Sequence, residues 1–239
     1  MVSCGGAQQG LLEVWRSISP TDGIAVPPQR KGALVPLEPA LLWKVSWPGF
    51  HSVMQLLDWF EVPDGFTLLM ERPQRCQDLW YFLHEQRFLT EPVAQGLLCQ
   101  VLEAVRRCSS RGALHHHIKA KNVLVNLATG KAKLIDFGCG TILQDTFYTR
   151  MSGTPEYSPP EWILFGCYHG LPATIWSLGI LLYELVCRYL PFHTNEDIVW
   201  GQLFFLPWVS QAGEEVDLLG SAGGGGTCAS VLVSSARED

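Results

Sequence analysis

The sequence lacks the features that typify nucleic-acid-binding, secreted and membrane proteins. No basic run is longer than two residues and the formal net charge is −6, so the electrostatic footprint of a nucleic-acid-binding protein is missing. The longest apolar run, residues 175–185, is interrupted by Glu184 and is shorter than the ~20 residues that span a bilayer. The first ten residues show no pattern of a targeting signal. We expect a cytoplasmic protein, also found in the nucleus, with no nucleic-acid or membrane partner.

Closely spaced cysteine pairs are also lacking. The eight cysteines are irregularly spaced and none belongs to a C-x-x-C pair. Several fall inside apolar periodic segments, where a cysteine behaves as a small hydrophobic residue. We expect free thiols in a reducing compartment.

Apolar residues, by contrast, are abundant, at 47% of the chain against 17% charged, which is enough to build a core. They are concentrated in the middle of the chain. Residues 1–33 are rich in Gly, Pro, Ser and Gln and are expected to be a divergent, poorly ordered segment. Residues 210–239 contain a four-glycine run typical of a flexible tail.

Within this middle block, few strands precede several helices. We expect strands over 52–59 and 66–71, joined by a turn at 62–65, and a hairpin formed by 123–125 and 132–135. Helices are expected over 77–86, 91–109 and 174–187, the last buried on all sides. One face of the second helix should pack in the core, and it comprises Val93, Leu97, Val101, Ala104, Val105 and Cys108. The pattern predicts an α+β fold with two unequal lobes.

A series of short motifs follows the second expected helix. In chain order they are His115-x-x-x-Lys119-x-x-Asn122, Asp136-Phe-Gly138, Gly153-Thr-Pro155, Pro159-Pro-Glu161 and Trp176-Ser-Leu-Gly179. Their order and spacing resemble the catalytic half of a eukaryotic protein kinase. The resemblance extends over about residues 34–208.

Four further segments resemble the Pim family of serine/threonine kinases. They are Leu56-Leu-Asp-Trp-Phe60, the hinge Met70-Glu-Arg-Pro73, Tyr157-Ser-Pro-Pro-Glu-Trp162 and Trp176-Ser-Leu-Gly-Ile-Leu-Leu-Tyr183. The hinge proline is the most specific, because it has no backbone N–H to offer an adenine ring.

The resemblance implies a two-lobe protein-kinase-like fold. Residues 34–73 would be the remnant of an incomplete N-lobe, with helix C, two strands and the hinge, and residues 74–209 the core of a mostly helical C-lobe that lacks its last helices. The helix C glutamate is matched by Glu38, and the following Pro39 requires the helix to begin there.

The same resemblance implies ATP and Mg²⁺ as cofactors and basic Ser/Thr protein substrates as partners. Asn122 and Asp136 would bind Mg²⁺, and Lys119 would neutralise the γ-phosphate. Other ATP-side residues would be Glu38, Glu71, Pro73, Asp78 and Leu124, and the substrate side would comprise Asp78, Gly153 and Thr154. For Glu71, Asp78 and Leu124, ordinary surface or core roles are equally consistent with the sequence.

The sequence departs from the family at the catalytic position, where His115-His116-His117 replaces His-Arg-Asp. His115 is expected to be a core histidine. His117 takes the place of the catalytic Asp; an imidazole can accept a hydrogen bond but lacks the fixed negative charge. Loss of a positioned base is worth roughly 10²–10⁴ in rate. Three adjacent loop histidines are also poorly arranged to converge on one zinc ion.

Further departures affect the other parts of the machinery. No glycine-rich loop and no Val-Ala-x-Lys strand precede Glu38. Ala120 and Lys121 replace acidic residues that would face a basic substrate, which should weaken binding of Arg-rich sequences. Glu161 should lose a buried Arg partner, at a cost of about 3–5 kcal/mol. Because the last helices that would cover the helix over 174–187 are missing, one side of it should be partly exposed, at Leu178, Ile180, Leu181, Leu182 or Val186.

These departures leave three hypotheses. The chain is an active Pim-like kinase, a pseudokinase that binds nucleotide or a partner, or a truncated kinase-derived product that folds poorly and needs chaperones. We expect a Pim-like serine/threonine kinase fold in which phosphotransfer is lost or strongly impaired and binding of ATP and Mg²⁺ is weak or lost.

Overall fold

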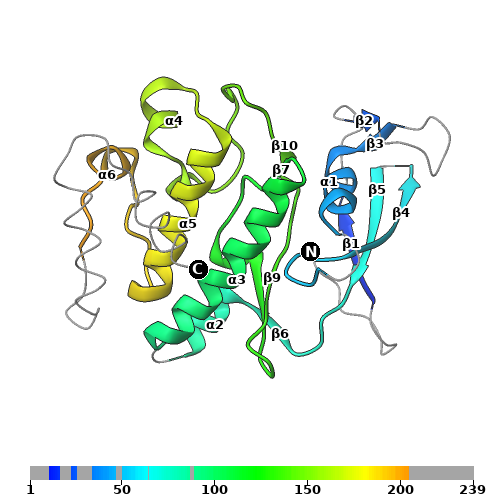
Figure 1. Ribbon diagram of the computed structural model, residues 1–239, viewed down its shortest axis with the longest axis horizontal. Coiled ribbons are helices and arrows are strands. Elements are labelled where there is room, and N and C mark those ends of the chain that lie inside the picture. Colours follow the sequence, from blue (N-terminus) through cyan, green and yellow to red (C-terminus); the bar gives the residue numbers. More distant parts are fainter. Residues whose placement is uncertain are drawn as a thin grey trace.

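The computed structural model of the chain describes residues 34–46, 50–63, 65–86 and 89–204, and the backbone of two earlier strands (Figure 1). These strands are β1 (Leu11–Arg16) and β2 (Gly23–Ala25). A smaller part made mostly of strands lies beside a larger, mostly helical part, which confirms the predicted α+β fold (Figure 1). The rest of the segment predicted over 1–33, and the tail predicted over 210–239, lie outside the described residues.

The sheet of the smaller lobe has the order β1-β5-β4, all antiparallel. Its central strand β5 (Gly65–Glu71) was predicted nearly as observed, but β4 (Leu56–Val62) begins four residues later than expected. Ser52 and Met54 bond instead to β9 (Ala132–Leu134) of the larger lobe, through Leu134 N–H to the Ser52 carbonyl (2.8 Å) and Met54 N–H to the Leu134 carbonyl (2.9 Å). The residues before β4 thus join the two lobes.

Helix α1 (Leu37–Val45) packs beside this sheet, directly after β3 (Leu34–Pro36), which pairs with β2. Glu38 is buried in its first turn and is followed by Pro39. A proline is tolerated there because the first turn of a helix does not need its N–H groups for intrahelical bonds. The requirement that this helix begin at the glutamate is therefore met.

The larger lobe is built on α2 (Leu79–Glu85), α3 (Glu91–Ser110) and α5 (Gly170–Cys187), with the short α4 (Pro160–Phe165) and α6 (Asn195–Trp200). Helix α2 starts two residues later than predicted, because residues Cys76–Asp78 form β6 and pair with the central hairpin. The predicted buried face of α3 is confirmed except at Val93, which is 45% exposed. This residue lies in the first turn of the helix.

Helix α5 crosses the core of the larger lobe and packs against α3. The predicted exposure is wrong for Leu178, Ile180 and Leu181, all of which are at most 2% exposed, while Leu182 and Val186 are half-buried. By length and composition α5 could cross a membrane, but 67% of it is buried inside the protein, as in a core helix.

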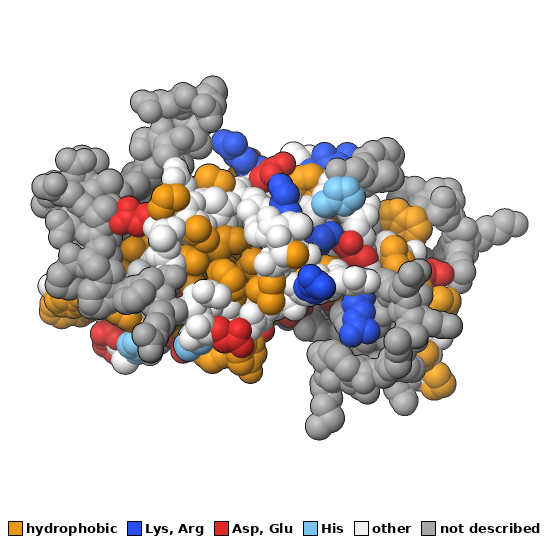
Figure 2. Space-filling model, turned by 90° about the horizontal axis from the view of Figure 1, so that it is seen from below, with side chains coloured by type: hydrophobic (Ala, Val, Ile, Leu, Met, Phe, Trp, Pro, Cys, Tyr) orange, Lys and Arg blue, Asp and Glu red, His pale blue; other side chains and the backbone are white. Residues whose placement is uncertain are grey.

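Four exposed apolar residues of this lobe lie on the neighbouring helices α4 and α6: Leu164, Phe165, Val199 and Trp200. The face seen from below likewise shows hydrophobic side chains gathered over the larger lobe (Figure 2). Glu161 of α4 is half-exposed and not buried, so the predicted cost of a buried, unpaired carboxylate does not apply. The six cysteines within the described residues are free thiols, as predicted: Cys76, Cys99, Cys108, Cys139, Cys167 and Cys187.

Because α5 is buried, truncating one of its core side chains should destabilise the protein. Leu181 is 0% exposed, so Leu181→Ala removes buried apolar volume and leaves a cavity. We expect the free energy of unfolding to fall by about 2–5 kcal/mol, measured by urea denaturation. Leu171→Ala, the same substitution in the first turn of α5 at a side chain that is 44% exposed, is the control and should cost far less. Equal losses for the two variants would contradict the burial of α5.

Candidate functional site

The predicted site residues are organised by a hairpin, β8 (Val123–Asn126) and β9, at the centre of the molecule (Figure 1). The helical turn η1 (Ala120–Asn122) leads into β8, and Asp136 lies two residues after β9. Ile135 N–H donates to the Asn122 carbonyl at 2.9 Å, which closes this end of the hairpin. The pairing brings Asn122 and Asp136 to the same end of the hairpin, although they are far apart in the sequence.

Both residues offer oxygen atoms to a metal ion. Asn122 is 5% exposed, and its Nδ2 donates to the His117 carbonyl at 2.8 Å, so the amide oxygen is the remaining polar atom. Asp136 has a left-handed backbone, with φ of 67°, and its Oδ1 accepts the Gly138 N–H at 3.1 Å. A non-glycine residue in this region costs about 1–3 kcal/mol and is common at functional sites. An amide oxygen and a carboxylate suit Mg²⁺, so these two residues fit the predicted metal.

His115 is a core histidine, as predicted. Its ring is 2% exposed, packs edge-on against Phe137 and lies with Nε2 2.8 Å from the Ile135 carbonyl. Nδ1 accepts the His117 N–H at 3.2 Å, so Nε2 carries the proton and donates to the carbonyl. Burial lowers the pKa of His115 to about 4.

His116 points into an aromatic cluster. Its backbone is left-handed, with φ of 61°, and its ring packs edge-on against Tyr148 and Tyr168, with centroids 5.1 and 5.7 Å away. Its Nε2 is buried and has no hydrogen-bond partner among the residues that the structure describes. Burial lowers the pKa of His116 to about 4. The first two histidine rings of the triplet therefore have separate surroundings.

His117 belongs to a polar cluster with residues from two other segments. Its Nε2 lies 2.9 Å from the Thr154 Oγ1, and its Nδ1 lies 3.6 Å from the Cys139 Sγ. Lys119 Nζ donates to the same Thr154 oxygen at 2.8 Å. Burial lowers the pKa of Lys119, and the charge of Asp136 opposes this. Three predicted site residues, His117, Lys119 and Thr154, are thus brought together, and Cys139 joins them without having been predicted.

Gly153 allows the segment that carries Thr154 to approach His117. Its φ is 133°, a conformation that favours glycine, and a Cβ there would lie 3.3 Å from the His117 ring and from the His116 carbonyl oxygen. Any larger residue would be strained and would push Thr154 away from the histidine.

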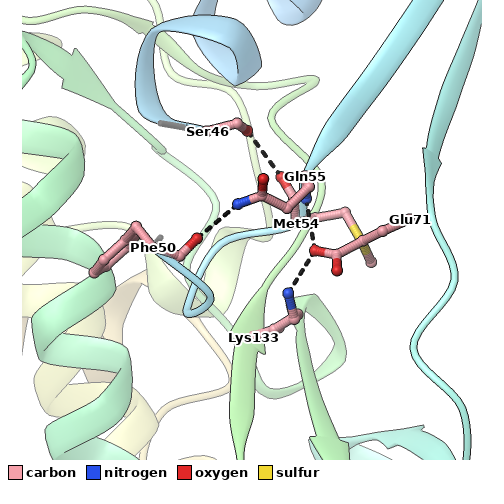
Figure 3. Close-up of polar contacts among 6 residues, drawn as sticks. All are labelled: Ser46, Phe50, Met54, Gln55, Glu71 and Lys133. Carbon is pink, nitrogen blue, oxygen red and sulfur yellow. Dashed lines mark hydrogen bonds and ion pairs between the residues drawn. The ribbon is translucent and has the colours of Figure 1, made fainter. Parts of the chain in front are cut away.

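On the predicted nucleotide side, the Glu71 carboxylate takes part in a polar network at the end of β5 (Figure 3). Glu71 Oε1 forms an ion pair with Lys133 of β9 and accepts the Gln55 N–H at 2.8 Å. The Gln55 side chain donates to the Phe50 carbonyl at 2.6 Å, and Ser46 Oγ donates to the Met54 carbonyl at 3.1 Å. The carboxylate therefore has a structural role that ties the smaller lobe to the hairpin. Lys133 was missed as a site residue, although the predicted hairpin already placed it opposite Leu124, a predicted nucleotide-side residue.

The remaining nucleotide-side residues lie on the hairpin, on the strand β6 that pairs with it, or in the smaller lobe. Leu124 is half-buried on β8 and pairs in register with Asp78 of β6. Asp78 caps α2, where its Oδ1 accepts the Tyr81 N–H at 2.9 Å. Pro73 is half-buried just after β5, whereas Glu38 lies in α1 of the smaller lobe.

One buried pair near the site was missed by sequence reasoning. Tyr157 OH donates to Glu184 Oε2 of α5, and both residues are buried. Burial raises the pKa of Glu184. This bond fixes the segment after Thr154 to the core helix. The signal in the sequence was Glu184 itself, a charged residue inside an otherwise apolar helix.

Comparisons with known proteins agree with this arrangement. The pattern of the protein kinase domain matches residues 30–208. Serine/threonine-protein kinase pim-2 of Danio rerio is 48% identical over 171 residues, which cover 69% of this chain and 55% of that protein. Serine/threonine-protein kinase prk-2 of Caenorhabditis elegans is 40% identical over 181 residues, which cover 74% of this chain and 41% of that protein. The chain therefore spans about half the length of these two relatives.

Proposed function

The chain belongs to the protein kinase domain family and is similar to Pim-like serine/threonine kinases. We propose that it has kept part of the nucleotide site but has lost efficient phosphotransfer. Members of this family use ATP and Mg²⁺ to phosphorylate proteins. The proposal concerns which of these steps the residues of this chain still support. We propose the cytoplasm, and the nucleus in addition, as its location, supported by the free cysteines.

The residues at the end of the hairpin where β8 begins support weak nucleotide binding. Asn122 and Asp136 would hold Mg²⁺, which when bound neutralises charge on the phosphates. Lys119 belongs to the His117 cluster, its charge interacts with that of Asp136, and its ammonium would contact the terminal phosphate. The sequence has neither a glycine-rich loop nor a Val-Ala-x-Lys strand, so the phosphate contacts that these two motifs make in kinases are not supplied by them here. Binding that relies mainly on two metal ligands and one lysine should be weak.

The observation that carries the proposal is the environment of His117. The position that needs a carboxylate to accept the proton of a substrate hydroxyl holds an imidazole, which adds no negative charge beside Lys119. Its Nε2 is already 2.9 Å from a hydroxyl of this same chain, that of Thr154. A substrate hydroxyl would have to replace Thr154 before His117 could orient it. A nucleotide-binding or partner-binding role without turnover is therefore favoured over an active kinase.

We expect Mg-ATP to bind the full chain with a dissociation constant on the order of 1 mM, which corresponds to about −4 kcal/mol. Isothermal titration calorimetry with and without Mg²⁺ measures this. Asp136→Asn should abolish the Mg²⁺ dependence, because it removes the carboxylate ligand, while Asp145→Asn, the same change at an exposed residue, should leave it unchanged. Micromolar binding that Asp136→Asn does not affect would show a phosphate site elsewhere in the chain.

A further inference from the structure

A cationic and aromatic surface lies beside the His117 cluster, where η1 packs against α2. Lys121 of η1 is exposed, and its Nζ lies 4.6 Å from the centroid of the Trp80 ring of α2. The ammonium is attracted to the face of the indole, which is the most favourable ring for this contact. This contact fixes the position of a charge that would otherwise move with a flexible side chain.

Trp80 also contacts two side chains of its own helix. The His84 ring is tilted by 32° against Trp80 with centroids 3.9 Å apart, and its Nδ1 lies 2.7 Å from the Trp80 carbonyl oxygen. Tyr81 packs edge-on against Trp80 at 5.0 Å and is 54% exposed. Lys121, Trp80, His84 and Tyr81 together form what we call the α2 platform.

Two carboxylates near the α2 platform have hydrogen-bond partners of their own. Glu184 is buried and accepts the Tyr157 hydroxyl, although its charge also interacts with those of His84 and Lys121, and Asp78 caps α2. Glu85 is exposed at the end of α2, and Glu156 lies on the side of Lys119. No carboxylate in the described part of the chain forms an ion pair with Lys121. An aromatic contact occupies one side of an ammonium and leaves its other N–H groups to solvent, so Lys121 can still bind an anion.

The α2 platform continues directly into the His117 cluster. Lys121 is two residues from Lys119, which donates to Thr154, and the intervening Ala120 is buried and adds no charge. The charges of Lys119 and Lys121 interact, so a peptide whose hydroxyl replaced Thr154 at His117 and that continued toward α2 would cross Lys121 and Trp80. The charge that it meets there is positive, opposite to the charge that would attract a basic sequence.

We propose that the α2 platform binds an acidic peptide segment, with a carboxylate of the partner on Lys121 and its apolar parts on Trp80 and Tyr81. The proposal rests on the proposed function in one respect: the partner peptide is taken to begin at the His117 cluster and to continue toward α2. Charge complementarity supports it, because a lysine next to a peptide path repels Arg and Lys and attracts Asp and Glu. The proposal reverses the basic partner that the family resemblance implies.

The test uses the full chain without nucleotide and two fluorescein-labelled decapeptides around one serine, one with four Glu and one with four Arg. Fluorescence anisotropy should show that the chain binds the Glu peptide at least about tenfold more tightly than the Arg peptide. The affinity for the Glu peptide should fall with added salt, because salt screens exposed charges. Lys121→Glu should lower affinity for the Glu peptide about tenfold, because an attraction becomes a repulsion. Trp80→Leu keeps the lysine and should lower affinity by a smaller factor.

The matched control is Lys44→Glu, which makes the same charge change at an exposed residue of α1 in the smaller lobe. It should leave affinity for the Glu peptide within about twofold. Tighter binding of the Arg peptide, no binding of either peptide, or equal effects of the two lysine variants would overturn the proposal. Because the measurement involves neither ATP nor turnover, detection of phosphotransfer would overturn the proposed function and leave this result standing.

Discussion

Purified chain with Mg-ATP and a serine peptide is expected to show no phosphotransfer above background, and His117→Asp alone is expected not to restore it. Replacing the carboxylate base accounts for roughly 10²–10⁴ of the lost rate. The substitution would return the negative charge beside Lys119 but would not supply the phosphate contacts of a glycine-rich loop and a β-strand lysine, whose motifs the sequence lacks. Incorporation of radiolabelled phosphate, followed over hours with both a Glu-rich and an Arg-rich peptide, measures the outcome.

The comparison needs two controls. The Danio rerio pim-2 kinase serves as the positive control of the assay, and thermal melts must show that His117→Asp is as stable as the original chain. Turnover by the unchanged chain would contradict the proposed loss of phosphotransfer. Robust turnover by His117→Asp would show that the histidine is the one defect and that the rest of the machinery is complete.

Lowering the pH from 7.5 to 5 is expected to destabilise the protein by roughly 2 kcal/mol through each of the buried rings of His115 and His116. The pKa of each ring is lowered by burial to about 4, whereas a histidine in the unfolded chain has a pKa of about 6.5. Between these values the unfolded state binds more protons than the folded state, so stability rises with pH through this window and is lost as the pH falls. Urea denaturation at a series of pH values between 4.5 and 7.5 measures the slope.

A histidine variant separates this effect from other titrations. Glu184, whose pKa is raised by burial, acts in the opposite direction, because its folded form holds a proton that the unfolded form has lost. His116→Asn removes one buried imidazole at a left-handed position that asparagine tolerates, and should reduce the slope. His169→Asn, at an exposed histidine, should leave the slope unchanged. An unchanged slope in His116→Asn would show that this ring is accessible to protons in the folded state.

Local patterns were sufficient for the elements whose neighbours are close in the chain. The hairpin β8–β9 and the helix α3 were predicted within about a residue, because a turn and a 3.6-residue period are properties of a short segment. The order of the motifs between His115 and Gly179 was enough to predict the α+β kinase-like fold, since their spacing places a loop, a hairpin and a core helix in sequence.

The errors arose where distant segments compete for the same residues. Ser52 lies in an apolar alternating run, yet it pairs with Leu134 because the backbone groups before β4 find partners on β9. The apolar composition of α5 correctly predicted a buried helix. Leu178, Ile180 and Leu181 were expected at a surface only because the resemblance implied missing covering helices, and they are buried because α5 packs against α3 and the surrounding core.

By itself the sequence determined the family, the positions of Asn122 and Asp136 relative to a hairpin, and the replacement of a catalytic carboxylate by His117, because each depends on residue type and spacing. Only the tertiary structure decided what those side chains contact. Glu71 is bound to Lys133, and Lys121 lies on Trp80 without an ion pair among the described residues. These pairs are 62 and 41 positions apart in the chain, and contacts across such separations depend on how α2, η1 and the two lobes pack, which no local pattern contains.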